Sequence, residues 1–573
     1  MAARKTIIIC LGVALACLSS VVLMRTRQHP EKFPASNVLV QVREMIREHC
    51  DQAGLRSRTP VEGEFILADT LLPHFYQQRD FTSAWTQDGT LSFQAKALLK
   101  AIERAGLEGL QPLDYHLSKI KELFRFVERR KANDSVRRAG LLSGLDLLCT
   151  DAFLTYAGHL VHGKVDPEKL EPAWQGVCVD EELVPILERA LATRQIEETL
   201  GRLSPQHDFY AGLKKKLASY RELATRSDWS VLSADPPLKK GDQGKWIKCI
   251  RRHLCDWGDL EEKTVTRQDV FDDELEKALC RYQKRHGLEV TGVPDPLTVA
   301  ALNVPPDERA RQVELNLERW RWMPHDLGER FIYVNIANFE LELFEGSRRI
   351  MAMKVVAGAE AWQTPEFASR MTHLVINPYW TIPIPVLLKE IAGYILQDPN
   401  YLRNNKMVIL RGRGDQETEV DPVTINWAKL TEKNLNFRIR QDPGPLNVLG
   451  RLKFIFPNKY EIFLHDTPYQ EDFAKTARVF SHGCVRAEKP VELAAFVLRG
   501  KPGWDMEKIM AAIDEPCEQT VKLIDPINVY FLYGTAWQDE DATMQFRPDI
   551  YLRDLRLARA LRQMPPSPPG PDR

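Results

Sequence analysis

The stretch RVFSHGCVR, residues 478–486, sets a histidine, a glycine and a cysteine side by side after a β-type run. Four explanations of Cys484 are open: half of a disulfide, a metal ligand, a buried core residue or a nucleophile. A disulfide or a core position gives no reason for the polar neighbours. A zinc site made of His465, His482 and Cys484 has suitable ligands but lacks an obvious fourth one. A nucleophile explains most of the pattern.

A cysteine attacks as its thiolate, and an ordinary thiol with a pKa near 8.5 carries little thiolate at neutral pH. It therefore needs a base, and His465 ends the strand-like stretch EIFLHDTP 19 positions before Cys484. A histidine can accept the thiol proton and return it later in the reaction. Gly483 lets the backbone approach a substrate, and the backbone N–H groups of Gly483, Cys484 and His482 are candidate donors to a developing oxyanion.

Five further residues are candidates for binding a substrate or shaping its cleft. Arg486 is suited to holding a substrate carboxylate or to bracing its own loop by hydrogen bonds. Ser481 is expected to hydrogen-bond within the loop, in either a structural or a catalytic role. The aromatic pair Tyr379 and Trp380 ends a strand-like run, where it either lines the cleft or packs in a core, and Asn447 is expected at the cleft floor.

The bulk composition excludes some classes of protein. A chain of 573 residues is too long for one core, so three or four domains are expected. With 78 Lys and Arg against 79 Asp and Glu, it lacks the basic surface that nucleic-acid binding requires. The ten cysteines are scattered and form no CxxC pair, which argues against a zinc ribbon or a dense disulfide framework.

The N-terminus carries an apolar segment. Thr6 to Met24 is uncharged and follows Arg4 and Lys5, and as a helix it would be roughly 28 Å long, about the thickness of a bilayer core. We predict an uncleaved membrane anchor. A cleaved signal peptide and a lipidated Cys17 are the alternatives, and all three would export the rest of the chain.

Periodicity divides the chain into segments of different character. Apolar residues at three- and four-residue spacing predict helices in the first half, and a change to strand periodicity follows Arg330. The expected segments are an anchor or signal (1–30), a helical scaffold domain (31–235), a small helical module (236–305), a linking helix (306–329), a mainly β catalytic domain (330–535) with a capping insertion (384–445), and a C-terminal extension with a disordered tail (536–573).

Two of these segments resemble known families. LKKGDQG, FDDELEKALCRYQKRHGL and TGVPDPLTVAALN, in this order, resemble the small α-helical peptidoglycan-binding module. The pattern His465-x15-Ser-His-Gly-Cys-Val-Arg resembles the signature of L,D-transpeptidases, the cysteine enzymes that cross-link peptidoglycan. QTPEFASRM, VINPYWTIP and QDPGPLNVLGRLKFIFPN agree with it. The layout resembles the large periplasmic branch: a multidomain protein with an N-terminal transmembrane helix, an all-α scaffold, the binding module, and a mainly β catalytic domain with an inserted capping subdomain.

This resemblance implies a reaction and a location. Cys484 would attack the carbonyl of diaminopimelate in a tetrapeptide stem, release D-Ala, and pass the acyl group to the diaminopimelate amine of a second stem, giving a 3→3 cross-link. His465 would be base and then acid, and carbapenems would acylate the thiol. The implied location is the periplasm, with the N-terminal helix in the inner membrane.

The implied partners are peptidoglycan stem peptides, the membrane and cell-wall synthesis proteins, without nucleic acid, metal or cofactor. An L,D-carboxypeptidase of the same fold and a non-catalytic wall-binding scaffold remain the alternatives.

Overall fold

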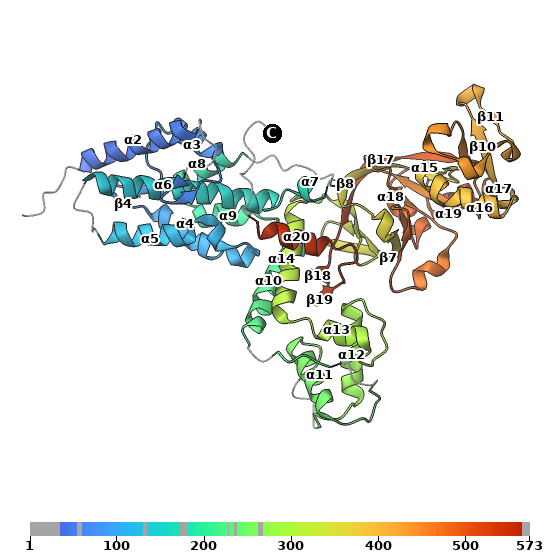
Figure 1. Ribbon diagram of the computed structural model, residues 1–573, viewed down its shortest axis with the longest axis horizontal. Helices are drawn as coiled ribbons and strands as arrows, with labels where there is room; N and C mark the ends of the chain where they lie inside the picture. Colours follow the sequence, from blue (N-terminus) through green and yellow to red (C-terminus); the bar gives the residue numbers. More distant parts are fainter. Residues whose placement is uncertain are drawn as a thin grey trace, which may run out of the picture.

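The computed structural model describes residues 35–53, 60–129, 135–171, 174, 182–226, 229–233, 238–261 and 267–563. A helical N-terminal domain, a small helical module and a β-rich domain meet at a pair of long helices (Figure 1). The predicted anchor (1–30) and the tail MPPSPPGPDR lie outside these ranges. Within them, no helix combines the length and apolar character that crossing a bilayer demands.

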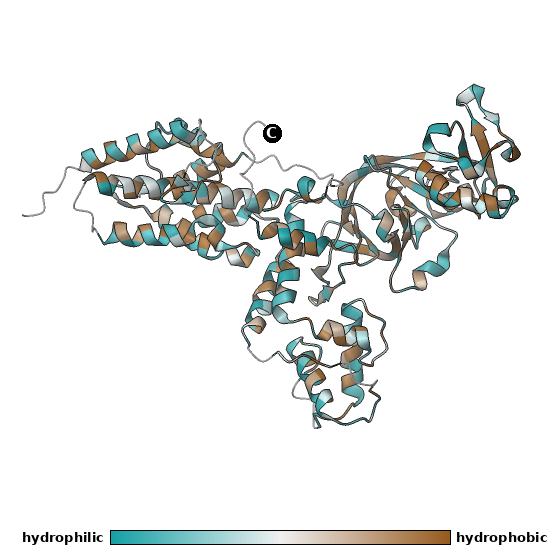
Figure 2. Cartoon of the chain, viewed as in Figure 1, coloured by the Kyte–Doolittle hydropathy of each residue, from teal (hydrophilic) through white to brown (hydrophobic). Residues whose placement is uncertain are grey.

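The N-terminal domain is built around helix α6 (Ser135–His162). Almost every residue of α6 from Leu142 to Val161 is buried, because the helix is apolar on all sides and is covered on all sides. Figure 2 shows hydrophilic and hydrophobic residues alternating along the outer helices of this domain. The α-helices of this domain that contact α6 are α2 (Ala35–Ala53), α3 (Leu71–Gln78), α4 (Phe93–Glu103), α5 (Leu117–Glu128), α8 (Leu183–Thr193) and α9 (Ile196–Leu203).

Two buried carboxylates of α6 hold the surrounding loops. Asp146 accepts hydrogen bonds from the Tyr76 hydroxyl at 2.7 Å and from the Trp85 amide at 2.9 Å. Asp151 accepts from the backbone of Leu67 at 2.9 Å and lies 2.7 Å from the His116 ring. The loops carry two short hairpins that helical periodicity did not predict, β1–β2 (Pro60–Val61, Glu64–Phe65) and β3–β4 (Thr86–Gln87, Thr90–Leu91).

Helices α10 (Asp208–Ala224) and α14 (Pro306–Arg321) form the centre of the molecule. The predicted linking helix is α14, and its Trp320 and Trp322 are buried in a shared core. That core also takes in residues of α20 (Arg553–Leu561) and of the hairpin β18–β19 (Ala536–Gln538, Met544–Phe546), so the C-terminal extension packs between the domains.

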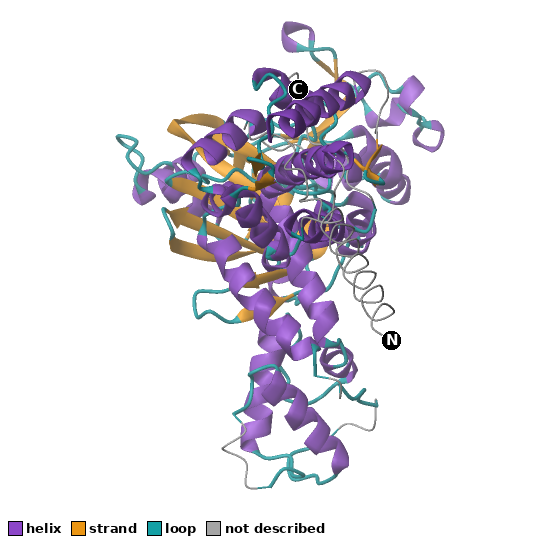
Figure 3. Cartoon of the chain, turned by 90° about the vertical axis from the view of Figure 1, so that its left-hand side faces the viewer, coloured by secondary structure: helices purple, strands orange, loops and turns teal. Residues whose placement is uncertain are grey.

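The small module is a three-helix unit consisting of α11 (Lys245–Asp256), α12 (Asp273–Arg285) and α13 (Pro296–Leu302). Asp272 and Asp295 cap α12 and α13 by accepting the amides of Leu275 and Thr298. In the side view of Figure 3 this module consists of helices joined by loops, and the large strands lie in the other half of the molecule.

The β-rich domain is a nine-stranded sheet in the order β15-β7-β16-β14-β13-β8-β17-β5-β6. An additional pairing of β6 with β7 brings the two ends of this order together, so the sheet closes around its core. Helices α18 (Pro490–Val497) and α19 (Met506–Asp514) contribute to the same core. The strands are β5 (Arg330–Asn335), β6 (Glu340–Glu345), β7 (Arg348–Gly358), β8 (Phe367–Ile376), β13 (Leu452–Ile455), β14 (Leu464–His465), β15 (Val479–Ser481), β16 (Val485–Ala487) and β17 (Gln519–Leu532).

The capping insertion has a sheet of its own, in the order β11-β10-β12-β9, and its own apolar core. The strand-like run that the aromatic pair Tyr379 and Trp380 ends divides between β8 and β9, because Asn377 adopts a positive φ of 49°. The insertion therefore begins near Trp380, ahead of the expected start at 384. Its elements are β9 (Trp380–Thr381), α15 (Ile384–Val386), a π-helical turn (Leu387–Ile391), α16 (Ala392–Gln397), α17 (Tyr401–Asn404), β10 (Met407–Arg411), β11 (Thr418–Glu419) and β12 (Arg438–Gln441).

Candidate active site

Cys484 lies at the end of a tight loop between β15 and β16 and is a free, half-buried cysteine. The preceding Gly483 has a φ of 104°, which disfavours any residue with a side chain. An added Cβ would also lie 3.1 Å from the Ile462 side chain. The Thr364 hydroxyl donates to the Gly483 carbonyl at 2.8 Å and holds the loop from the opposite side. Glycine is thus required for the turn that presents the thiol.

Strand register places His465 on the same face of the sheet as Cys484. Strands β14 and β16 are parallel, and Leu464 pairs with Val485 while His465 pairs with Arg486. Leu464 and Val485 are fully buried in the core. Because side chains alternate along strands, His465, Cys484 and Arg486 share the opposite face. The structure therefore brings the predicted nucleophile and the predicted base together.

The imidazole of His465 is held as a neutral base. Its Nδ1 lies 2.5 Å from the carbonyl oxygen of Asp466, which can only accept, so we assign the proton to Nδ1 and the lone pair to Nε2. Burial, and secondly the charge of Arg486, lowers the pKa of His465 to about 3. The Asp466 carboxylate accepts from the amides of Arg451 and Thr467 at 2.8 and 2.7 Å, which fixes the end of the strand.

The thiol of Cys484 is protonated in the resting site. Its Sγ lies 3.8 Å from the carbonyl oxygen of Glu461, a residue with a positive φ of 55°. Burial raises the pKa of the Cys484 thiol, and the positive charges of Lys453 and Arg486 oppose this rise only in part. A neutral thiol beside a neutral imidazole is therefore the ground state, and proton transfer must accompany attack.

Ser481 and Gly483 shape the loop through hydrogen bonds. The Ser481 hydroxyl donates to the Cys484 carbonyl and accepts from the Gly483 amide at 3.2 Å. These hydrogen bonds favour the structural role of Ser481 over the catalytic one. It also corrects one expectation, because the Gly483 N–H is already engaged and is not free to bind an oxyanion. The Cys484 N–H remains the predicted donor.

The His482 side chain points to the capping insertion. Its Nε2 lies 2.6 Å from the carboxylate of Glu390, in the π-helical turn, and its ring packs edge-on against Trp362 at 5.3 Å. Lys389, next to Glu390, lies over the same Trp362 ring at 4.4 Å. The His482 side chain therefore links the loop to the insertion.

Two candidates for substrate contact are engaged by the protein instead. The Arg486 guanidinium lies 3.1 Å from the Asp472 carboxylate and is mostly buried, which is the bracing alternative. Asn447 is only 1% exposed, and its amide donates to the carbonyls of Pro378 and Asp442 at 2.9 and 3.1 Å. Asn447 thus shapes the floor of the site without an atom free for a ligand.

The aromatic pair divides between two roles. Tyr379 is 39% exposed, with the Arg440 guanidinium 4.2 Å from its ring centre, so it is accessible to a ligand. Trp380 packs against the apolar core of the insertion, which is the packing alternative.

Sequence reasoning missed Lys453. Strand β13 pairs with β14 so that Lys453 lies directly opposite His465, on the polar face. The available signal was the alternation in RLKFIFPN, where Leu452 and Phe454 are fully buried and Lys453 lies between them. The alternation predicts that Lys453 faces away from the core, but only the strand pairing shows which residue it meets.

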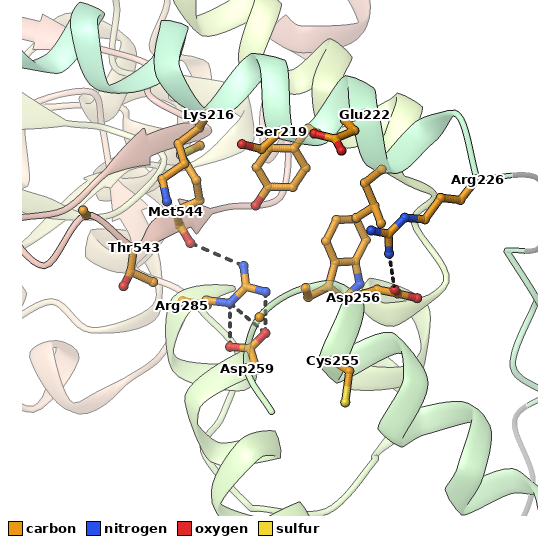
Figure 4. Close-up of a pocket in the computed structure, with 15 residues that line it drawn as sticks. Lys216, Ser219, Glu222, Arg226, Cys255, Asp256, Asp259, Arg285, Thr543 and Met544 are labelled. Atoms are coloured by element: carbon orange, nitrogen blue, oxygen red, sulfur yellow. Dashed lines mark hydrogen bonds and ion pairs between the residues drawn. The ribbon is translucent and has the colours of Figure 1, made fainter. Parts of the chain in front are cut away.

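The described residues hold no group of three or more His, Cys, Asp or Glu side chains placed to bind a metal ion. A cavity of about 480 Å³ opens elsewhere, where α10, the small module and the β18–β19 hairpin meet (Figure 4). Its walls carry Arg285 paired with Asp259 and Arg226 paired with Asp256. None of its lining residues belongs to the Cys484 loop. We therefore place the chemistry at Cys484.

Comparison with known proteins identifies three domains. Residues 70–217 match the family model of a "Scaffold domain", residues 246–302 that of a "Putative peptidoglycan binding domain", and residues 329–504 that of an "L,D-transpeptidase catalytic domain". A curated protein of Haemophilus influenzae, described as a "Putative L,D-transpeptidase", is 30% identical over 249 residues, covering 43% of this chain and 49% of the relative. The chain thus spans about half the length of that relative.

Similar solved structures carry the same description. An L,D-transpeptidase from Stackebrandtia nassauensis is 13% identical with a TM-score of 0.21, covering 53% of this chain and 97% of that one. An L,D-transpeptidase from Xylanimonas cellulosilytica is 12% identical with a TM-score of 0.17, covering 52% of this chain and 99% of that one. Scores this low add nothing to the assignment.

The three domain matches confirm the predicted resemblance. The chain is a multidomain protein that carries a scaffold domain, a peptidoglycan-binding domain and a mainly β L,D-transpeptidase catalytic domain, in this order.

Proposed function

We propose that this protein is an L,D-transpeptidase that forms 3→3 cross-links between peptidoglycan stem peptides through a thioester on Cys484. One observation carries the proposal: Cys484 and His465, to whose Nε2 we assign the free lone pair, share one face of the sheet. A thiol next to a base is the minimum that acyl transfer requires.

In the first half-reaction, Sγ of Cys484 attacks the carbonyl of the third stem residue while its proton passes to Nε2 of His465. The tetrahedral intermediate then collapses, and the C–N bond to D-Ala breaks. His465 returns the proton to the leaving amine, so free D-Ala departs and a thioester remains.

In the second half-reaction, the diaminopimelate amine of another stem attacks the thioester, and His465 takes the excess proton. The C–S bond breaks, the new amide is the cross-link, and the proton returns to Cys484. The half-buried position of the thiol supports transfer to an amine, because a site that limits water limits hydrolysis.

Domains that act on peptidoglycan imply a cell-wall or periplasmic location. Anchoring by residues 1–30, acylation by carbapenems and contacts with cell-wall synthesis proteins stay predictions that belong to this proposal.

The test is to incubate the full chain with a disaccharide-tetrapeptide and to measure the products by mass. A dimer that lacks one D-Ala supports the proposal, a tripeptide monomer indicates the carboxypeptidase, and unchanged substrate indicates a non-catalytic scaffold. Cys484→Ala should abolish both the dimer and any carbapenem adduct. The matched control is Cys517→Ala, which removes an exposed free cysteine and should change neither.

A further inference from the structure

Lys453 is a half-buried cation beside the nucleophile. Its Nζ lies 3.8 Å from the centre of the Phe463 ring, and its strand partner is His465. Burial lowers the pKa of the Lys453 ammonium. Cys484 when ionised, and after it Glu518 and Glu461, oppose this shift through electrostatics, but no carboxylate among the described residues forms an ion pair with Lys453.

The other cations around the site have partners. Arg486 and Lys475 both bind the carboxylate of Asp472, at 3.1 and 2.7 Å. Arg451 donates to the side-chain oxygen of Asn377 at 2.6 Å. An ammonium taken out of water without a partner costs free energy, so a protein that retains one in this position gains by a ligand that supplies the anion.

The reaction places an anion near this position. His465 must hand its proton to the nitrogen of the leaving residue, so that nitrogen lies beside the imidazole in the reacting complex. In a tetrapeptide stem the leaving residue is the last one, and a single carbon separates its nitrogen from a free carboxylate. Lys453 is the direct neighbour of His465 across the β13–β14 pair and is therefore positioned to meet this carboxylate.

We propose that Lys453 binds the free carboxylate of the leaving residue and thereby selects donor stems that end at the fourth residue. In a longer stem the same position carries an uncharged amide, which cannot replace the carboxylate. This inference rests on the proposed function, and it names the residue of that site that recognises the donor stem.

The test compares a donor tetrapeptide that ends in a carboxylate with one that ends in a carboxamide, by the kcat/KM of Cys484 acylation. A hydrogen bond to a charged group contributes about 1.5–3 kcal/mol, so amidation should slow the wild type about 10- to 150-fold. Lys453→Met should lower the kcat/KM of acylation by the acid donor by a similar factor. In this variant, amidation of the donor should not change the kcat/KM further. Lys453→Arg should recover part of the preference, since it restores the charge.

Lys522→Met is the matched control. Lys522 is an exposed lysine on β17, and its strand partner His373 also pairs with Ile455, so it lies on the same face of the same sheet. This substitution should leave the acid-to-amide ratio unchanged. Equal acylation of both donors by the wild type would overturn the inference. It would also be overturned if amidation slowed Lys453→Met by the same factor as it slows the wild type, because the two changes would then act independently.

A second readout separates substrate binding from activation of the thiol. Iodoacetamide is neutral and has no carboxylate, so Lys453→Met should alter its rate of reaction with Cys484 by no more than about threefold. If alkylation falls as steeply as acylation, Lys453 acts on the thiol and the inference is wrong. If the wild type is not acylated by the acid donor at all, the proposed function fails instead.

Discussion

Helix α14 and the Cys484 face differ in whether two arginines of the helix and a lysine of the face have carboxylate counterions. In α14, Arg319 and Arg321 are each only 1% exposed, yet Arg319 lies 2.6 Å from Asp554 and Arg321 lies 2.7 Å from Glu318. At the Cys484 face, the half-buried Lys453 forms no ion pair with any carboxylate of the described residues. A buried charge with its counterion serves the structure, whereas one without a counterion indicates a site that a ligand completes.

The paired charges also explain how the domains are joined. Although burial alone would lower the pKa of Arg319, Asp554 and Glu366 hold it above its ordinary value. Arg321 also donates to the Glu108 carbonyl and to the Tyr210 hydroxyl. These contacts connect α14 to the N-terminal domain, α10, the catalytic domain and α20. The scaffold and the catalytic domain are therefore tied through one helix.

The largest effect is expected at the proposed catalytic pair, Cys484 and His465. His465→Ala should slow acylation of Cys484 on the order of 10⁴-fold, because nothing remains to take the thiol proton. Single-turnover acylation followed by mass measures this loss. His465→Gln, which keeps the volume and a hydrogen-bonding group, should be equally slow if proton transfer is the cause. Activity within tenfold of the wild type would contradict the assigned base.

The next effect should appear at the paired charges. Arg319→Met should reduce the free energy of unfolding by about 3–5 kcal/mol, because it leaves Asp554 buried without its cation and leaves Glu366 with Arg553 alone. Urea unfolding of the full chain, followed by tryptophan fluorescence, measures the change. The double variant Arg319→Met with Asp554→Leu should recover much of the loss. A loss below about 1 kcal/mol would show that this pair does not hold the domains.

A smaller effect is expected when the reactivity of the Cys484 thiol is measured at successive pH values. Since the pKa of Cys484 is raised and that of His465 is lowered to about 3, thiolate accumulates only at alkaline pH. The rate of Cys484 alkylation by iodoacetamide should therefore rise about tenfold per pH unit, from pH 6 to beyond the ordinary thiol pKa near 8.5. A plateau between pH 5 and 8 would instead indicate a thiolate–imidazolium pair at rest.

The same shift at His465 affects stability. Its folded pKa lies below the ordinary value of 6.5, so between these values the unfolded chain binds more protons. The contribution of the neutral His465 to the free energy of unfolding should be fully present above pH 6.5 and should decline as the pH falls toward 3. His465→Gln should reduce the slope of this decline in urea midpoints, and an unchanged slope would argue against a neutral buried imidazole.

The smallest effect should come from a charge pair in water. Arg202 and Glu198 lie 2.5 Å apart on the surface of α9 and are largely exposed. Arg202→Ala should change stability by about 0.5 kcal/mol or less in urea unfolding, because an exposed pair gains little over hydration. A loss comparable to that of Arg319→Met would remove the distinction between the two kinds of pair.

Local patterns predicted much of the site. The sequence around Cys484 predicts a nucleophile in a glycine turn, and EIFLHDTP predicts a histidine at a strand end. The structure shows the turn at Gly483 and places His465 at the end of β14, while the role of Cys484 stays a prediction. The same reasoning could not resolve Asn447 and Arg486, whose residue types suit a ligand and a brace equally well. Burial and the partner Asp472 decided between these roles, and both come from parts of the chain that only folding brings near.

What the sequence determined by itself is the set of short-range features: helix and strand periodicity, the glycine that the Cys484 turn requires, and the order of the domains. These depend on neighbours a few residues apart. The tertiary structure alone decided that Lys453 meets His465, that His482 meets Glu390, and that α14 joins the domains. Such meetings depend on strand register and on packing between distant segments, because a shift of one residue would turn each strand's other face to the site.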